Sequence, residues 1–288
     1  MLVRGADTVP VPGAWVVAHR VGPERQGAID SLRSDARGRF RFTVPRPESL
    51  TVYLVSSRYA GIGYFSEPFD HRSRAGADAL TLAVFDTASG GTPLTIAGRH
   101  VVVTRPDASG LRRVLDVVDV RNDGATTRVA ADSLAPVWRM RLPDDVNELE
   151  VGQSEFATSS IRFENGAVLV AAPFPPGEKQ VAVTYVLPAD ASRFTVPVDQ
   201  PTAEFSVLAE DSLTSVAGGL SRADPLVLEG RVFQRFVARN LAAGSRPAVS
   251  LAGGVGGVAR YWWLPIAAVG LALAGGAIYA ARRRVAPR

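Results

Sequence analysis

The end of the chain holds a long apolar run that is followed at once by a cluster of arginines. Residues 262–281, WWLPIAAVGLALAGGAIYAA, contain no charged side chain, and Arg282, Arg283 and Arg284 come next. The hydrocarbon core of a bilayer is about 30 Å thick and takes roughly 20 helical residues to cross. The run therefore predicts a single transmembrane helix over residues 261–281, with a basic tail over residues 282–288.

Aromatic side chains at both ends of the run support this prediction. Trp262 and Trp263 at one end and Tyr279 at the other are amphipathic rings, typical of the two headgroup layers of a membrane. By the positive-inside rule the arginines stay in the cytoplasm, so the preceding residues are expected outside it. A buried core helix is the alternative, although such a helix normally has a polar face.

Small residues recur every four positions inside the predicted span, at Ala268, Ala272 and Gly276. A stripe of this kind lets two membrane helices approach closely. The stripe therefore predicts a homodimer that forms through the anchor.

Export of the N-terminal part requires a targeting signal, and residues 1–20 show no basic segment leading into an apolar one and no small-residue cleavage site. One explanation is a start codon assigned too far downstream, which would remove a signal peptide and a first strand. The rival is a tail-anchored protein whose bulk lies in the cytoplasm, with its arginines carried across the bilayer against the charge rule. We favour the first explanation.

Composition excludes several classes of site and partner. The 288 residues include no cysteine, which excludes disulfides, thiolate metal sites and a cysteine nucleophile. Of 32 basic residues only Lys179 is lysine, and the arginines are interspersed with 28 acidic residues. A nucleic-acid footprint would gather basic residues in one stretch. We therefore expect no nucleic-acid partner, and we expect the basic tail to contact anionic lipid headgroups.

The segments before the apolar run have the pattern of β-strands. Short runs rich in Val, Ile, Thr, Phe and Tyr are separated by Gly, Pro, Asp and Asn, and no long 3.6-residue repeat occurs among them. The pattern predicts an all-β fold with two β-sandwich domains, immunoglobulin-like or prealbumin-like, ahead of the transmembrane helix. The predicted strands are residues 14–21, 38–44, 50–56, 100–104, 113–121, 168–172, 180–187, 204–208 and 231–237. Turns are predicted at residues 35–38, 122–124, 165–166 and 175–177.

The first 86 residues contain PVPGAWVVAHRV, SDARGRFRFTVP and LTVYLVSS. These segments resemble the carboxypeptidase regulatory-like module, also called prealbumin-like or transthyretin-like. The resemblance rests on Pro12 and Gly13, which open a strand, and on Asp35, Gly38 and Phe40, which form a turn into the next one. It implies a seven-stranded sandwich in which these five residues are scaffold and carry no catalysis. The family's first strand is absent from the pattern, so we expect this domain, residues 1–86, to lack it.

A linker over residues 87–92 leads into a second β region, residues 94–251, for which no named family is apparent. Its segment LDVVDVRNDGATTRV resembles the strand, turn and strand of immunoglobulin-like modules. A glycine-rich tether over residues 252–260 follows. Trp15 and Trp138 lie in alternating apolar runs, so we expect both to be core or half-buried residues and not a sugar-stacking platform.

Metal and nucleotide sites are not predicted. His19, His71 and His100 are each isolated from a second ligand at helical or strand spacing. The loop around Asp70 and His71 could offer oxygen ligands to a hard cation, but a solvated loop is the simpler interpretation. The glycines of residues 253–257 belong to no phosphate-binding motif.

Motifs for nucleophilic or acid–base catalysis are not predicted either. There is no G-x-S-x-G sequence. The acidic residues Asp144, Asp145, Glu148 and Glu150 are expected to be turn residues and not the acid and base of a glycosidase. We therefore predict no catalytic, cofactor-binding or metal-binding residue, no cofactor, and a protein that is not an enzyme.

Together these observations predict a non-catalytic, single-pass membrane protein with an extracytoplasmic bulk, periplasmic or at the cell surface. Its β-sandwiches would act as a binding or structural module for an unidentified protein or glycan. Two alternatives stay open: an accessory module of an exported enzyme or of a transport or secretion assembly, and a carbohydrate-binding protein.

Overall fold

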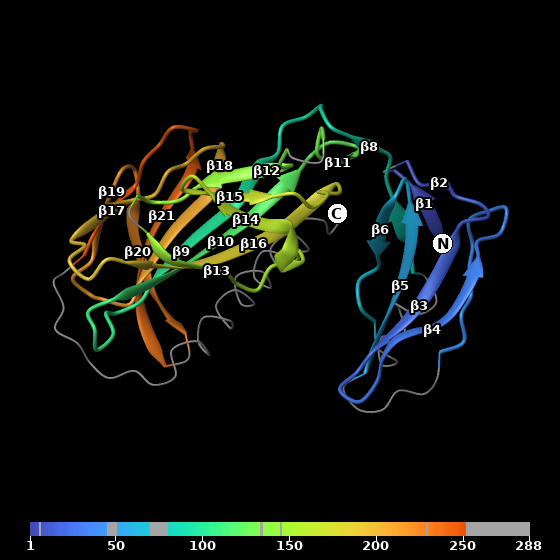
Figure 1. Ribbon diagram of the computed structural model, residues 1–288, viewed down its shortest axis with the longest axis horizontal. Helices are drawn as coiled ribbons and strands as arrows, with labels where there is room; N and C mark the ends of the chain where they lie inside the picture. The colour runs from blue at the N-terminus through green and yellow to red at the C-terminus, as the bar shows by residue number, and fades with distance from the viewer. Residues whose placement is uncertain are drawn as a thin grey trace, which may run out of the picture. The chain divides into compact units, whose positions relative to one another are not determined.

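The computed structural model describes residues 1–5, 7–44, 51–69, 80–132, 135–144, 146–228 and 230–251. Within these ranges every regular element is a β-strand, apart from one short 3₁₀ turn at Thr158–Ser160 (Figure 1). The predicted all-β class is confirmed. No helix in the described ranges is long and apolar enough to cross a membrane, and the predicted span at residues 261–281 lies outside them.

The chain divides into two compact units. The first comprises Met1–Gly91 together with Gly124–Val129, and the second comprises Thr92–Asp123 and the described residues from Ala130 onward. Within the first unit, β8 (Thr87–Ala88) pairs in parallel with β11 (Thr127–Arg128). The predicted linker over residues 87–92 therefore begins with a strand.

The first unit contains a four-stranded sheet in the order β4-β3-β5-β6 and a three-stranded sheet in the order β2-β1-β7. Side chains from both sheets form its core, which includes Val16, Val55, Leu82 and Val84. The strands of the larger sheet are β3 (Trp15–Val21), β4 (Gln26–Arg33), β5 (Val52–Tyr59) and β6 (Ile62–Phe65), and those of the smaller are β1 (Leu2–Arg4), β2 (Val9–Pro10) and β7 (Leu82–Val84).

Two predictions about the first unit are wrong. A strand does precede the one at Trp15: β1 pairs in parallel with β7, and Leu2 is fully buried. Three residues are too few for an alternating pattern to reveal such a strand. Residues 38–44 form no strand, because their backbone is not paired with any described strand. Phe40 and Phe42 still pack against the core of the unit.

The second unit is built on a seven-stranded sheet in the order β13-β16-β10-β9-β18-β21-β20. All neighbouring strands are antiparallel except β9 and β18, which are parallel. The strands are β9 (Thr95–Val103), β10 (Arg112–Asn122), β13 (Asn147–Val151), β16 (Gly177–Leu187), β18 (Thr202–Ala209), β20 (Ser221–Leu228) and β21 (Arg231–Leu241).

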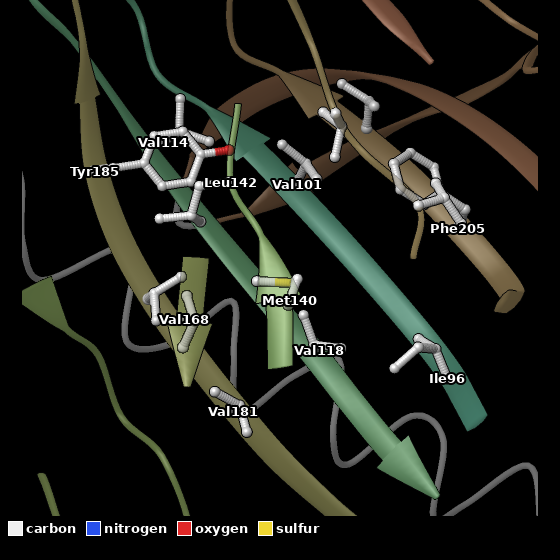
Figure 2. Packing of buried hydrophobic residues seen from close by; sticks show 14 of the residues in the cluster. Ile96, Val101, Val114, Val118, Met140, Leu142, Val168, Val181, Tyr185 and Phe205 are labelled. Atoms are coloured by element: carbon white, nitrogen blue, oxygen red, sulfur yellow. The ribbon is translucent and has the colours of Figure 1, made fainter. Parts of the chain in front are cut away.

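Two small sheets supply the other side of the main core. One is β12 (Trp138–Arg141), β15 (Ala167–Val170) and β14 (Ile161–Glu164), and the other is β17 (Arg193–Thr195), β22 (Ala248–Ser250) and β19 (Ser215–Ala217). Figure 2 shows Met140 and Val168 from the first of these sheets beside Val118 and Val181 of the large one. This packing of sheet against sheet gives the second unit its sandwich character.

Two predicted turns of the second unit have different outcomes. Asn165 and Gly166, at φ 50° and 68°, connect β14 to β15 as a tight hairpin of the kind that Asn-Gly predicts. Residues 122–124 do not return the chain beside β10. The next strand, β11, pairs with β8 instead, and Thr127 is fully buried with its amide donating to Asp86 O at 2.8 Å.

An ion pair is buried inside the sandwich of the second unit. Arg99 on β9 donates from Nε and Nη2 to the two carboxylate oxygens of Asp116 on β10, at 2.9 and 2.6 Å. Its Nη1 donates to Pro197 O at 2.6 Å, just beyond β17. Burial acts to lower the pKa of Arg99, but the charge and hydrogen bonds of Asp116 outweigh it, so the pKa lies above its ordinary value. The pair thus joins two strands of the large sheet to the opposing layer.

Replacement of Asp116 with alanine should lower the free energy of unfolding of the second unit by about 3–5 kcal/mol, because a guanidinium would be left buried without its partner. The double variant Arg99→Met with Asp116→Leu should recover most of this loss. Urea denaturation followed by circular dichroism would measure both. A single variant no less stable than the double would contradict the assignment.

The hydroxyl of Tyr185 is buried in the same core, where it neither donates nor accepts a hydrogen bond. Burial, followed by the nearby Asp116 carboxylate, raises the pKa of this phenol well above its ordinary value. Tyr185→Phe should therefore raise the free energy of unfolding by about 1 kcal/mol, since it removes an unsatisfied buried group. Tyr64→Phe is the matched control and should destabilise, because Tyr64 donates to Phe85 O at 2.9 Å. Thermal denaturation of both variants would show opposite shifts.

Candidate binding surface

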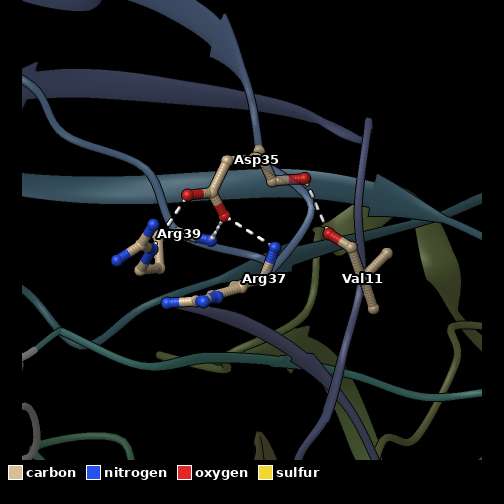
Figure 3. A network of polar contacts seen from close by, with 5 residues as sticks. Val11, Asp35, Arg37 and Arg39 are labelled. Atoms are coloured by element: carbon tan, nitrogen blue, oxygen red, sulfur yellow. Dashed lines mark hydrogen bonds and ion pairs between the residues drawn. The ribbon is translucent and has the colours of Figure 1, made fainter.

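The predicted turn residue Asp35 holds the corner that follows β4 (Figure 3). Its Oδ1 accepts hydrogen bonds from the amides of Arg37 and Arg39, both at 2.8 Å, and Arg39 Nε donates to Oδ2 at 2.8 Å. The bond from the Arg39 amide is the main cause that lowers the pKa of this carboxyl. Gly38 has a φ of 69°, and a Cβ at this position would lie 2.4 Å from Leu2 O. Only glycine fits this close approach.

The other predicted scaffold residues lie around the same corner. Gly13 has a φ of 71°, follows Pro12 and donates from its amide to Ser34 O at 3.0 Å. Ser34 Oγ in turn donates to Val11 O at 2.6 Å. Phe40 is half-buried against the core of the first unit. These groups hold backbone segments together at the corner.

The remaining predicted functional positions lie outside the described residues. They are the membrane-anchor residues Trp262, Trp263, Tyr279, Arg282, Arg283 and Arg284 and the helix-dimer stripe Ala268, Ala272 and Gly276.

No group of three or more metal-ligating side chains occurs within the described part of the chain. His71 lies outside that part. His19 Nε2 lies 2.7 Å from Ser56 Oγ, and Glu148 is paired with Arg113 at 3.4 Å.

His100 lies in a small buried polar cluster of the second unit. Its Nδ1 is 2.7 Å from Ser206 Oγ, and Asp119 accepts a hydrogen bond of 3.1 Å from Gln180. A Cβ on Gly98 would be 3.2 Å from His100 Nε2 and 3.1 Å from an Asp119 oxygen, so glycine provides the space in which the two side chains meet. Serine, histidine and aspartate come together here, yet Ser206 is only 2% exposed and lies within the paired β9–β18 ladder. The Ser206 side chain is therefore shielded from solvent.

Burial is the main cause that lowers the pKa of His100, and Arg235 acts in the same direction, whereas Asp119, Glu204 and Asp116 act to raise it. Burial raises the pKa of Asp119. Because the pKa of His100 is lower in the folded state, the unfolded chain binds more protons than the folded chain once the pH falls below about 6.5. The contribution of His100 to stability is thus present above that pH and is lost as the pH falls toward the folded-state pKa.

The contribution of His100 to the free energy of unfolding of the second unit should accordingly decrease between pH 7.5 and pH 5.5, with a slope of at most about 1.4 kcal/mol per pH unit. Asp119, whose pKa is raised, acts in the opposite direction. His100→Gln should remove that part of the slope. Urea denaturation of both proteins across this pH range tests the prediction. An identical pH dependence in the two would show that the folded and unfolded pKa values of His100 are the same.

The outer face of the four-stranded sheet in the first unit exposes large aromatic side chains. Trp15 is 53% exposed and Phe65 is 64% exposed. We call this surface the Trp15 face. It consists of the side chains at paired positions that lie on the same side of the sheet as Trp15: Trp15, Val17, His19, Val21, Gln26, Ala28, Ser31, Arg33, Val52, Leu54, Ser56, Arg58, Gly63 and Phe65.

The exposure of Trp15 contradicts the prediction that it is a core or half-buried residue, whereas Trp138, at 4% exposure, is buried as predicted. In β3 both alternating sets of side chains are largely apolar, so the period of two does not tell which set is inside. The smaller sheet packs on the side of Val16, and Trp15 is left on the other. Sequence reasoning missed the site for this reason, although an aromatic in a strand with two apolar faces was a usable signal.

Trp15 is the centre of a row of side chains that crosses the sheet. The guanidinium of Arg33, its partner on β4, lies 4.7 Å from the centre of the indole ring, a cation–π contact. Arg58 on β5 is its neighbour on the opposite side when the β3–β5 register is extended by one residue from Val16 and Ser57. Beyond Arg58 comes Gly63, and a Cβ there would lie 3.7 Å from the ring of Phe65. The face thus alternates two arginines with two aromatic rings.

No protein-family model matches this chain, and no curated protein matches it significantly.

Proposed function

We propose that this is a non-catalytic, membrane-anchored extracytoplasmic protein whose first unit binds a partner through the Trp15 face. The observation that carries the proposal is the exposure of Trp15 and Phe65 on one sheet face, at 53% and 64%. Exposed aromatic surface is unfavourable in water by roughly 25 cal/mol per Å². Apolar patches that persist on a soluble surface are characteristic of interaction sites.

The assignment of the first unit to a carboxypeptidase regulatory-like sandwich belongs to this proposal. It is supported by the Asp35 turn, with its two capped amides, and by Gly38 in the left-handed region. Two β units, each with its own hydrophobic core, ahead of an anchor suit a module that holds a binding surface outside the cell. The anchor itself is supported by the apolar run over residues 262–281 and the three arginines behind it.

A non-catalytic role is supported by the state of the polar clusters. His19 and His100 are each engaged with a serine on the neighbouring strand, at 2.7 Å, and Asp35 is occupied with the amides of its own turn. Carbohydrate binding is the second candidate, because an exposed indole on a flat sheet is a surface on which a sugar ring can stack.

The absence of native cysteine allows one experiment to test both the location and the surface. Single cysteines replace Ser31 on the Trp15 face, Arg37 off that face, and Arg288 in the tail, and intact cells are treated with a membrane-impermeant maleimide. Ser31 and Arg37 are both exposed, so each reacts readily in the purified protein.

We expect Arg37→Cys to react in intact cells, Arg288→Cys to react only after lysis, and Ser31→Cys to react at least several-fold more slowly in cells than in purified protein, because a partner covers it. An unreactive Arg37→Cys would overturn the extracytoplasmic location. Equal rates for Ser31→Cys in cells and in purified protein would instead show that the surface is unoccupied.

A further inference from the structure

We infer that the occupant of the Trp15 face is an acidic segment of a protein, whose carboxylates pair with Arg33 and Arg58 while an apolar side chain lies on Trp15 between them. The inference rests on the proposed function and specifies the partner's chemistry.

The charged side chains of the Trp15 face are positive. The paired positions of the face include two arginines, on opposite sides of Trp15, and no aspartate or glutamate. Arg33 donates from Nη1 to Gly13 O at 2.6 Å, and Arg58 donates from Nε to Gly61 O at 3.3 Å. These backbone contacts position the guanidinium groups. A guanidinium has five donor hydrogens, and no contact of either group with another residue of the described ranges uses the rest, apart from the Trp15–Arg33 stack, so a carboxylate can be bound. A negatively charged partner is the complement of this arrangement.

The Trp15 face carries the residue types that are typical of protein interfaces. Tryptophan and arginine are the side chains that most often dominate binding energy at protein interfaces, and interface cores are depleted in lysine, glutamate and aspartate. The Trp15–Arg33 stack places both types side by side, with the guanidinium 4.7 Å from the ring centre. Val17 and Val21 on β3 and Leu54 on β5 add apolar side chains to the same face.

The polar groups of the face argue against a glycan. Sugars are held by many hydrogen bonds, and the polar groups of His19 and Ser56, at the middle of the face, are bonded to each other at 2.7 Å. His19 also packs against Phe65, with 6.2 Å between ring centres. Apart from Gln26 and Ser31 on the edge strand β4, the face therefore offers apolar area and two positive charges, which suits an acidic peptide with a central apolar side chain better than a sugar.

The test is a display selection on the purified full chain in detergent. The library consists of twelve-residue peptides with a central Phe or Leu, in which the flanking positions are drawn from Asp, Glu, Asn and Gln. We compare the wild type with Arg58→Gln and with Arg37→Gln, which removes the same charge from an exposed turn of the same unit. Polygalacturonate and phosphatidylglycerol vesicles are tested as competitors. Thermal denaturation of each variant checks that it is folded.

The wild type and Arg37→Gln should enrich Asp and Glu about tenfold over Asn and Gln beside the central apolar residue, and Arg58→Gln should lose this preference. The enrichment should also decrease between 50 and 500 mM salt, because screening weakens exposed pairs. No acidic preference, or an equal loss in Arg37→Gln, would overturn the inference.

Displacement of the selected peptides by polygalacturonate or by the vesicles would assign the face to an acidic glycan or to lipid headgroups, and would likewise overturn it. The outcomes are separable from those of the proposed function. A Ser31→Cys that is protected in cells, together with no acidic preference in the selection, would preserve the binding role and reject only the acidic partner.

Discussion

The buried ion pair between Arg99 and Asp116 is the interaction on which the second unit depends. Both side chains are almost completely inaccessible, at 3% and 0% exposure, and every charged oxygen of Asp116 is matched by a donor from Arg99. The third contact, from Arg99 to Pro197 O, reaches the opposing layer. A shift of one layer along the other would separate these donors and acceptors, and an unpaired buried charge is strongly unfavourable.

The first unit uses a different device for the same purpose. Its corner is held by two amides that donate to the Asp35 carboxylate and by the Ser34 hydroxyl, which donates to Val11 O. The Leu2 amide also donates to Gly38 O at 2.7 Å. These bonds fix the start of β3 and the end of β4, which are the two segments that carry Trp15 and Arg33. The stacked pair on the exposed face is therefore built on a rigid support. A binding surface that is already ordered loses little conformational entropy when a partner arrives.

Much of the strand content follows directly from the sequence, and the exceptions have identifiable causes. β10 and β16 are long, central and rich in valine, so their pattern is strong, and the Asn165-Gly166 hairpin follows from turn chemistry alone. β4 was not predicted, because an edge strand such as QGAIDSLR is largely polar. Residues 38–44 alternate apolar and polar side chains as a strand does, yet their backbone pairs with no described strand. Local pattern reports which side chains can be buried, and pairing depends on segments far away in the chain.

The sequence by itself determined the all-β class, most of the long strands and the turn formed by Asp35 and Gly38, because these depend on side-chain period and on local backbone preferences. It also supplied the apolar run behind the anchor proposal. Only the tertiary structure decided that Trp15 is outside and Val16 inside, that Arg99 meets Asp116, and that His100 meets Ser206, which is 106 positions away. The physical reason is that, in a strand with two apolar faces, the face that becomes buried is decided only when a second sheet packs on it. The side left uncovered, with Trp15 between two arginines, is the binding surface that we propose.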